Sequence, residues 1–166
     1  MILSNSVALI YLAKVREEKI LMQLFDGIAV SETVYKEVVE RGKEGGYLDA
    51  YKIEELEGFI HVEKLNKEHS KLAEKLVGQG IERGEAETIA LAKQLNLEVI
   101  LDEKKARNVA DLVGIPYFGT LALILRAVKE KKVTEKDAER IVEKMIRAGL
   151  RVSRRSCQSV AARASV

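Results

Sequence analysis

The sequence predicts an α/β fold: a three-layer α/β/α sandwich with a central parallel sheet of about four or five strands. Short apolar runs of four or five residues alternate with longer segments of helical periodicity, the pattern of strands covered by helices on both faces. The chain has 166 residues, of which 47% are hydrophobic and 33% are charged. It is long enough for one domain with a real core, and its composition is that of a globular protein.

The first half of the chain begins with an apolar run, a polar turn and the helical run VALIYLAKV. Ser4, Asn5 or Ser6 is expected to cap that helix, and Ser31 is expected to cap a later one. The expected elements are, in order, a strand at residues 1–3, helices at 7–15 and 17–25, a strand at 27–30, helices at 32–41 and 47–56, a strand at 58–62 and a helix at 68–77.

The second half repeats the alternation of helix and strand. Glycines 78 and 80 end the preceding helix, Thr134 is the expected cap of the last helix, and Gly149 breaks the chain after it. The expected elements are a helix at 85–95, a strand at 97–101, a helix at 104–113, a strand at 117–118, and helices at 121–129 and 135–147.

Composition excludes several classes of protein. The single Cys157 rules out an internal disulfide framework, and with only His61 and His69 a Cys/His zinc site is not expected. A reducing, cytoplasmic setting is expected instead. The apolar run at 7–13 is too short to span a bilayer and follows no basic segment, so no membrane contact or signal peptide is predicted. Many Lys and Glu with few Cys, Pro and Trp indicate a thermophile.

Charge is distributed unevenly along the chain. Residues 151–166 contain four arginines and no acid, whereas the rest of the chain has a small excess of acidic groups. We therefore expect a domain over residues 1–149 and a basic, poorly ordered tail over 150–166. Such a tail either contacts phosphates or is simply solvated.

Polar residues follow three of the predicted strands. Asn5 and Ser6 follow the first strand, Asp102 and Glu103 follow the fourth, and Thr120 follows the last. An open parallel sheet binds its ligands beyond the carboxyl ends of its strands. These five residues are therefore candidates for a functional site.

Helical geometry places the two acids of the helix over 85–95 on different sides of it. At 100° per residue, Glu85 lies on the apolar side of this helix, whereas Glu87 lies beside Gln94 on the polar side. Glu87 is expected to be an ordinary exposed charge. Glu85 is either a site residue or a first-turn acid that the helix dipole stabilises.

The same geometry leaves two further alternatives open. Glu37 lies at the edge of the buried stripe of its helix, next to Val34, where it either reaches a cleft or is solvated. Lys104, Arg107 and Asp111 share the outer side of their helix, which is either solvated or in contact with a polyanion.

Acids gathered at strand ends repel one another unless a cation lies among them. Oxygen ligands without His or Cys select hard ions, here Mg²⁺ or Mn²⁺. Such an ion suits the hydrolysis of a phosphodiester, because it activates a water and offsets charge on the leaving oxygen.

Four segments in this order resemble the PIN domain, specifically its prokaryotic branch with GEAE and DD-K-A-R type motifs. They are SNSVALIYLAKV, SETVYKEVVE, GEAETIALA and VILDEKKARNVADLVGIPYFGTLALILRA. The resemblance covers about residues 1–149 and is most specific over 84–126. It implies an α/β/α sandwich, a Mg²⁺ or Mn²⁺ site made of acids, and ribonuclease activity. Many members of this family are the toxin halves of toxin–antitoxin pairs and homodimers are usual, so the expected partners are RNA, an antitoxin protein and a second copy of the chain.

The resemblance assigns roles residue by residue. The catalytic residues that it implies are Glu37, Glu85 and Asp102. The implied metal ligands are Asn5, Glu37, Glu85, Asp102 and Glu103, with Glu103 where a second Asp is frequent. The implied contacts to RNA are Ser6, Lys104, Arg107 and Thr120, to which Lys105 is added as a further phosphate contact.

One position departs from the family pattern, which begins with a strand followed by Asp. Here Asn5 takes the place of that Asp, and it can ligate through its carbonyl oxygen but carries no charge and cannot act as a base. The alternative is therefore a PIN-like module of weak or no activity that binds RNA or a protein. An unrelated phosphate-binding α/β domain is disfavoured because no Walker or Rossmann glycine fingerprint is present.

Overall fold

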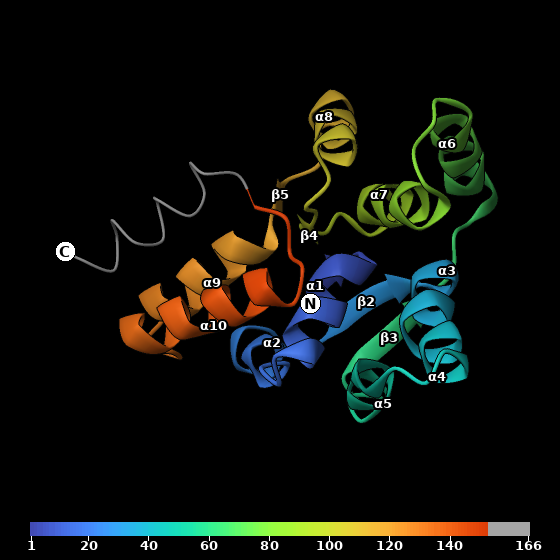
Figure 1. The fold of residues 1–166 in the computed structure, drawn as a ribbon. Coiled ribbons are helices and arrows are strands. Elements are labelled where there is room, and N and C mark those ends of the chain that lie inside the picture. Colours follow the sequence, from blue (N-terminus) through green and yellow to red (C-terminus); the bar gives the residue numbers. More distant parts are fainter. Residues whose placement is uncertain (153–166) are drawn as a thin grey trace.

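A five-stranded parallel sheet runs through the centre of the computed structural model, which describes residues 1–152 (Figure 1). All five predicted strands are present, each within two residues of its expected start. They are β1 (Ile2–Ser4), β2 (Ile28–Ser31), β3 (Ile60–Glu63), β4 (Val99–Ile100) and β5 (Tyr117–Phe118).

Helices connect the strands, as the periodicity predicts. They are α1 (Ser6–Lys14), α2 (Lys19–Leu24), α3 (Glu32–Tyr35), the π-helix η1 (Lys36–Arg41), α4 (Gly42–Glu44), α5 (Leu48–Glu54), α6 (Lys67–Gly78), α7 (Arg83–Leu95), α8 (Lys104–Val113), α9 (Thr120–Lys129) and α10 (Glu135–Arg147). The Thr134 cap of α10 is confirmed, since its hydroxyl oxygen accepts from the Asp137 N–H at 3.1 Å.

The strand order is β3-β2-β1-β4-β5, so the chain builds the sheet outward from β1 in one direction and then returns to build it in the other. Strands β1 and β4 are neighbours, with Ser4 opposite Ile100. The crevice between two such strands, where the order reverses, is the usual ligand site of open parallel sheets. Asn5 and Asp102 follow these two strands.

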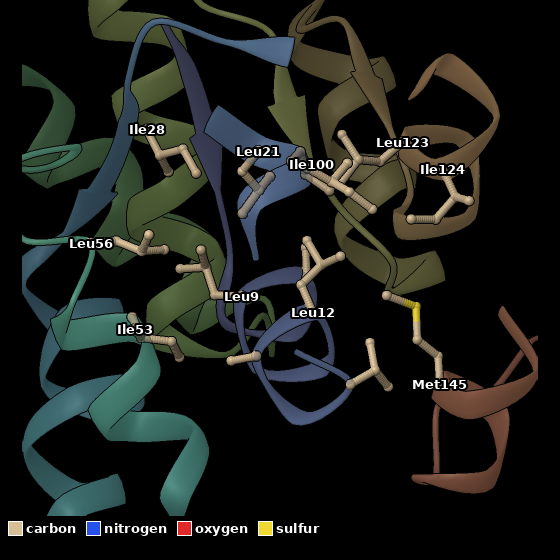
Figure 2. Close-up of a cluster of buried hydrophobic side chains, with 14 of the residues drawn as sticks. Leu9, Leu12, Leu21, Ile28, Ile53, Leu56, Ile100, Leu123, Ile124 and Met145 are labelled. Carbon is tan, nitrogen blue, oxygen red and sulfur yellow. The ribbon is translucent and has the colours of Figure 1, made fainter. Parts of the chain in front are cut away.

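The two faces of the sheet carry separate hydrophobic cores, because successive residues of a strand point to opposite sides. Ile2 and Ile100 face one side, and Leu3 and Val99 face the other. The first core is covered by α1, α2, α5, α9 and α10, and Figure 2 shows its Leu9, Leu12, Leu123 and Met145 gathered around Ile100. Helices α6, α7 and α8 cover the second core (Figure 1). The predicted three-layer sandwich is thus confirmed.

The helical segment after β2 differs from the regular helix expected over 32–41. It begins as predicted, because Ser31 Oγ accepts from the Val34 N–H at 3.1 Å. After one turn of α-helix the chain continues as the π-helix η1. Segments of this wider helix are rare and often lie at functional sites. Glu37 lies in this segment.

The predicted basic tail over 150–166 lies outside the described residues from position 153 onward. Arg154, Arg155 and Arg163 belong to that part, so the division of the chain at residue 149 stays a prediction. Among the described residues, no helix has the length and apolar character needed to cross a membrane.

Candidate active site

A small pocket of about 60 Å³ opens at the carboxyl end of β1. Three elements contribute polar side chains to it: the start of α1, the π-helix η1 and the start of α7. These side chains are those of Asn5, Ser6, Glu37, Glu82 and Glu85. Four of these five are predicted site residues that lie far apart in the sequence, and the fold brings them to one place.

Asn5 is the residue just before α1, and its side chain is 2% exposed. Its backbone has the extended conformation of a helix cap, but its side chain forms no capping hydrogen bond. Neither does Ser6 or Ser4, whose hydroxyl donates to the Asn5 carbonyl oxygen at 2.9 Å. Asn5 therefore occupies the predicted cap position of α1, but without the side-chain hydrogen bond expected of a cap. Within the described residues Asn5 Oδ1 has no hydrogen-bond partner, which is rare for a buried oxygen.

Glu85 lies in the first turn of α7 and is partly buried, as the apolar side of the helix predicts. The pKa of its carboxyl is raised to about 7, chiefly by burial and also by the nearby carboxylates of Glu82, Glu103 and Glu37. Lys105 acts in the opposite direction. Glu85 is thus surrounded by like charges, and near pH 7 it is about half protonated when no cation is bound.

The start of α7 lies close to the helix that carries Glu37. A Cβ atom at Gly84 would lie 3.6 Å from Glu37 Oε2 and 3.4 Å from Val34 Cγ2, which are ordinary van der Waals distances. Glu37 is exposed, and it lines the pocket together with Gly84 and Glu85.

Asp102 forms the second part of the site, after β4. Its Oδ1 accepts from the Thr120 N–H at 2.9 Å, and its Oδ2 accepts from the Thr120 hydroxyl at 2.5 Å. Thr120 is the first residue of α9 and follows Gly119, which has no side chain to cap the helix. The Asp102 carboxylate therefore satisfies an N-terminal N–H of α9 and benefits from the helix dipole.

Arg107 packs against this group and does not extend from the outer side of α8, so that expectation is wrong for this residue. Its Nε donates to the Leu101 carbonyl oxygen at 2.7 Å, and its Nη2 lies 3.6 Å from Asp102 Oδ1. Its guanidinium also lies 6.0 Å from the centre of the Tyr117 ring. Gly119 provides the space, because a Cβ atom there would overlap Arg107 Nη2 and lie 2.9 Å from Asp102 Oδ1.

Lys104 and Lys105, at the start of α8, differ in the contacts of their side chains. Lys105 Nζ donates to the Gly80 carbonyl oxygen at 2.6 Å, which ties α8 to the turn before α7. Lys104 is exposed and forms no ion pair or hydrogen bond with another residue in the range 1–152. Of the predicted phosphate contacts, Lys104 is the most available.

Two acids at the start of α7 have surroundings that the sequence did not predict. Glu87 is not fully solvated: its side chain is 16% exposed and lies 3.7 Å from Arg83 Nη1. Glu82 was not predicted as a site residue, although it lines the pocket and raises the pKa of Glu85. Its position three residues before Glu85, one turn away along the chain, is the sequence signal that would have identified it.

The predicted ligands form two groups and not a single cluster. Glu37 and Glu85 lie at the pocket with Asn5, whereas Asp102 is engaged by Thr120 and Arg107. Over residues 1–152, no three Asp, Glu, His or Cys side chains are close enough to hold one metal ion. The chemistry of the pocket nevertheless fits a hard cation, because Asn5 Oδ1 has no hydrogen-bond partner among the described residues and the acids around Glu85 raise its pKa more than Lys105 lowers it.

Comparison with known protein families agrees with this geometry. The model of the family described as a PIN domain matches residues 1–166. No match was found among curated proteins. PIN domains are generally nucleases that act on RNA and typically use divalent metal ions. The chain therefore belongs to the PIN domain family.

Proposed function

We propose that this protein is a metal-dependent ribonuclease that hydrolyses phosphodiester bonds of RNA at the carboxyl ends of β1 and β4. The observation that carries the proposal is the pocket in which Asn5, Glu37 and Glu85 meet, beside the strand that positions Asp102. The π-helix supports it, because it places Glu37 on the rim of this pocket.

The oxygen atoms of the site suit Mg²⁺ or Mn²⁺. At the pocket, Glu37 and Glu85 would hold the ion through carboxylate oxygens and Asn5 through Oδ1, with Asp102 and Glu103 as further acids after the neighbouring strand. When bound, the ion would activate a water and stabilise negative charge on the leaving oxygen.

The residues of the chain itself prepare this site. Thr120 holds Asp102 by two hydrogen bonds and is buried, which favours a positioning role for Thr120 over a contact to RNA. Arg107 is likewise held by Leu101 and Asp102. Lys104 and Ser6 are left as contacts to the RNA phosphates.

The test is cleavage of single-stranded RNA in the presence of Mn²⁺ or Mg²⁺. We expect cleavage that EDTA abolishes and that Asp102→Asn reduces by at least ~10–100-fold, the usual cost of a damaged metal shell. Asp111→Asn is the matched control, since the Asp111 carboxylate lies on the outer side of α8, where it accepts from the Tyr117 hydroxyl at 3.1 Å. Equal cleavage by Asp102→Asn and the parent would show that the site is elsewhere.

A second candidate function is a PIN module that binds RNA or protein without cutting. Asn5 favours it, because the first acid of the family pattern is absent here. Calorimetry with Mn²⁺ separates the two functions. Binding by the parent supports the nuclease, whereas no binding at millimolar Mn²⁺ that Asn5→Asp restores supports the non-catalytic module.

The partners that we propose follow from the family resemblance and not from contacts in the structure. They are a second copy of the chain in a homodimer and an antitoxin protein that neutralises a toxin. Gel filtration of the purified chain tests the first, because a dimer elutes at twice the 18.5 kDa mass of the monomer.

A further inference from the structure

A second, larger hollow lies beside the site pocket. It has a volume of about 270 Å³ and lies between α1, the end of η1 and the start of α5. Glu37 lines both this groove and the pocket at Asn5. The two hollows are therefore neighbours on either side of Glu37, and a polymer bound at the site would pass this groove.

The groove carries two exposed cations, Lys14 and Arg41, which form no ion pair with any acid among residues 1–152. Lys14 Nζ lies 5.2 Å from the centre of the Tyr11 ring, a contact that leaves its charge without an acidic partner. The acids of the groove are Glu37, which belongs to the candidate metal site, and Asp49 in the first turn of α5. Cations without an acidic partner beside a hydrolytic site suit a phosphate backbone.

Tyr47 forms the far end of the groove and is 61% exposed. One edge of its ring lies against Gly45, where a Cβ atom would approach Tyr47 Cε2 to 2.6 Å. Its N–H donates to the Gly42 carbonyl oxygen at 2.9 Å, and the Gly45 N–H donates to the Arg41 carbonyl oxygen at 2.9 Å. The exposed ring is thus fixed to the end of the helix that bears Glu37.

We propose that this groove binds the stretch of single-stranded RNA next to the cleaved bond, with one base stacked on Tyr47 and phosphates beside Lys14 and Arg41. The proposal rests on the ribonuclease function proposed above and adds a substrate subsite to it. A fixed aromatic ring and unpaired cations along one groove are the usual means of holding single-stranded nucleic acid without sequence preference.

The apolar surface beside the groove serves as an internal control. Leu48 is 77% exposed and follows Tyr47 directly, but it does not line the groove. A protein partner on this face would use Leu48 as well as Tyr47, because interfaces bury apolar side chains together. RNA in the groove would use Tyr47 alone.

The test is fluorescence anisotropy of a labelled 12-nucleotide oligouridine with the full chain in EDTA, where binding is measured without cleavage. We expect Tyr47→Ala to weaken binding by about 5- to 100-fold, the loss typical of one base–aromatic stack, and Tyr47→Phe to restore it. Leu48→Ala should bind like the parent. Lys14→Gln and Arg41→Gln should each lower the slope of log K against log salt by about 0.7.

Cleavage in Mn²⁺ gives a second readout. Tyr47→Ala should raise KM for the 12-nucleotide RNA, because the strand next to the cleaved bond loses the ring on which its base stacks. Unchanged binding and cleavage by Tyr47→Ala would overturn the subsite and leave the ribonuclease standing. An altered gel-filtration volume of Tyr47→Ala and Leu48→Ala with unchanged RNA affinity would make the surface a protein interface. No RNA binding by the parent would overturn both proposals.

Discussion

Both carboxylate oxygens of Asp102 accept hydrogen bonds from Thr120, one from its N–H at 2.9 Å and one from its hydroxyl at 2.5 Å. The two residues follow neighbouring strands, β4 and β5, at the carboxyl ends of the sheet. The pair therefore fixes an acid of the candidate site through the N-terminus of α9. Four predictions follow from this and related contacts.

Thr120→Val removes the hydroxyl but keeps the shape of the side chain. We expect a loss of about 1.5–3 kcal/mol in the free energy of unfolding, because the hydroxyl bonds to a charged group in a buried position. Urea unfolding of Thr120→Val, Asp102→Ala and the double variant measures the coupling between the two residues. Strictly additive losses would show that the hydroxyl does not stabilise the fold through Asp102.

Gly119→Ala places a methyl group in the space occupied by Arg107 and Asp102. We expect it to cost about 1–3 kcal/mol of stability, as overpacking does, and to reduce RNA cleavage by displacing Asp102. Gly58→Ala is the control, because a Cβ atom there has no neighbour within 4 Å, and its effect should stay within about 0.5 kcal/mol. A Gly119→Ala variant as stable and active as the parent would contradict the assigned packing.

Glu85→Gln should alter the pH dependence of stability when no metal is bound. The pKa of Glu85 is raised from 4.5 to about 7 in the folded protein, so the native state binds the proton more tightly than the unfolded chain. Its contribution to stability is fully present below pH 4.5 and is lost as the pH rises to about 7. Because solvent screens this partly buried carboxylate, the expected effect is reduced to about 1–2 kcal/mol. Between pH 4 and pH 8, the stability of Glu85→Gln should rise by this amount relative to that of the parent.

Thermal unfolding in EDTA across this pH range measures the effect of Glu85→Gln. Glu87→Gln is the matched control on the same helix, because Glu87 is paired with Arg83. Mn²⁺ should stabilise the parent above pH 7 and not Glu85→Gln, since the ion favours the ionised carboxylate. Parallel pH profiles for Glu85→Gln and the parent would refute the raised pKa.

Ser31→Ala removes the cap of the helix that leads to Glu37. We expect a loss of about 1 kcal/mol in unfolding free energy and weaker Mn²⁺ binding, because the first turn before η1 frays. Thr134→Ala removes the equivalent cap of α10 and should cost about as much without any effect on Mn²⁺. Calorimetry measures Mn²⁺ binding by both variants. Equal affinities of Ser31→Ala and Thr134→Ala for Mn²⁺ would show that the Ser31 cap does not support the metal site.

Much of the fold could be predicted because it depends on local pattern. The short buried strands and the caps at Ser31 and Thr134 are confirmed, and so is the partial burial of Glu85. The predictions that the structure contradicts concern residues whose tertiary contacts outweigh their local preference. Arg107 turns from the outer side of its helix toward Asp102, because its Nε donates to the Leu101 carbonyl oxygen and Gly119, after the neighbouring strand β5, leaves space for its guanidinium.

The sequence by itself determined the α/β alternation and the identity of the polar residues at the strand ends, because these depend on hydrophobic periodicity and chain order. Only the tertiary structure decided which of them meet. The return of the chain past β1 places Asn5 beside the strand of Asp102, and the packing of α7 beside η1 brings Glu85 and Glu37 to one pocket. It also left Asn5 Oδ1 buried without a partner, because strand order and close packing fix positions that no spacing along the chain encodes.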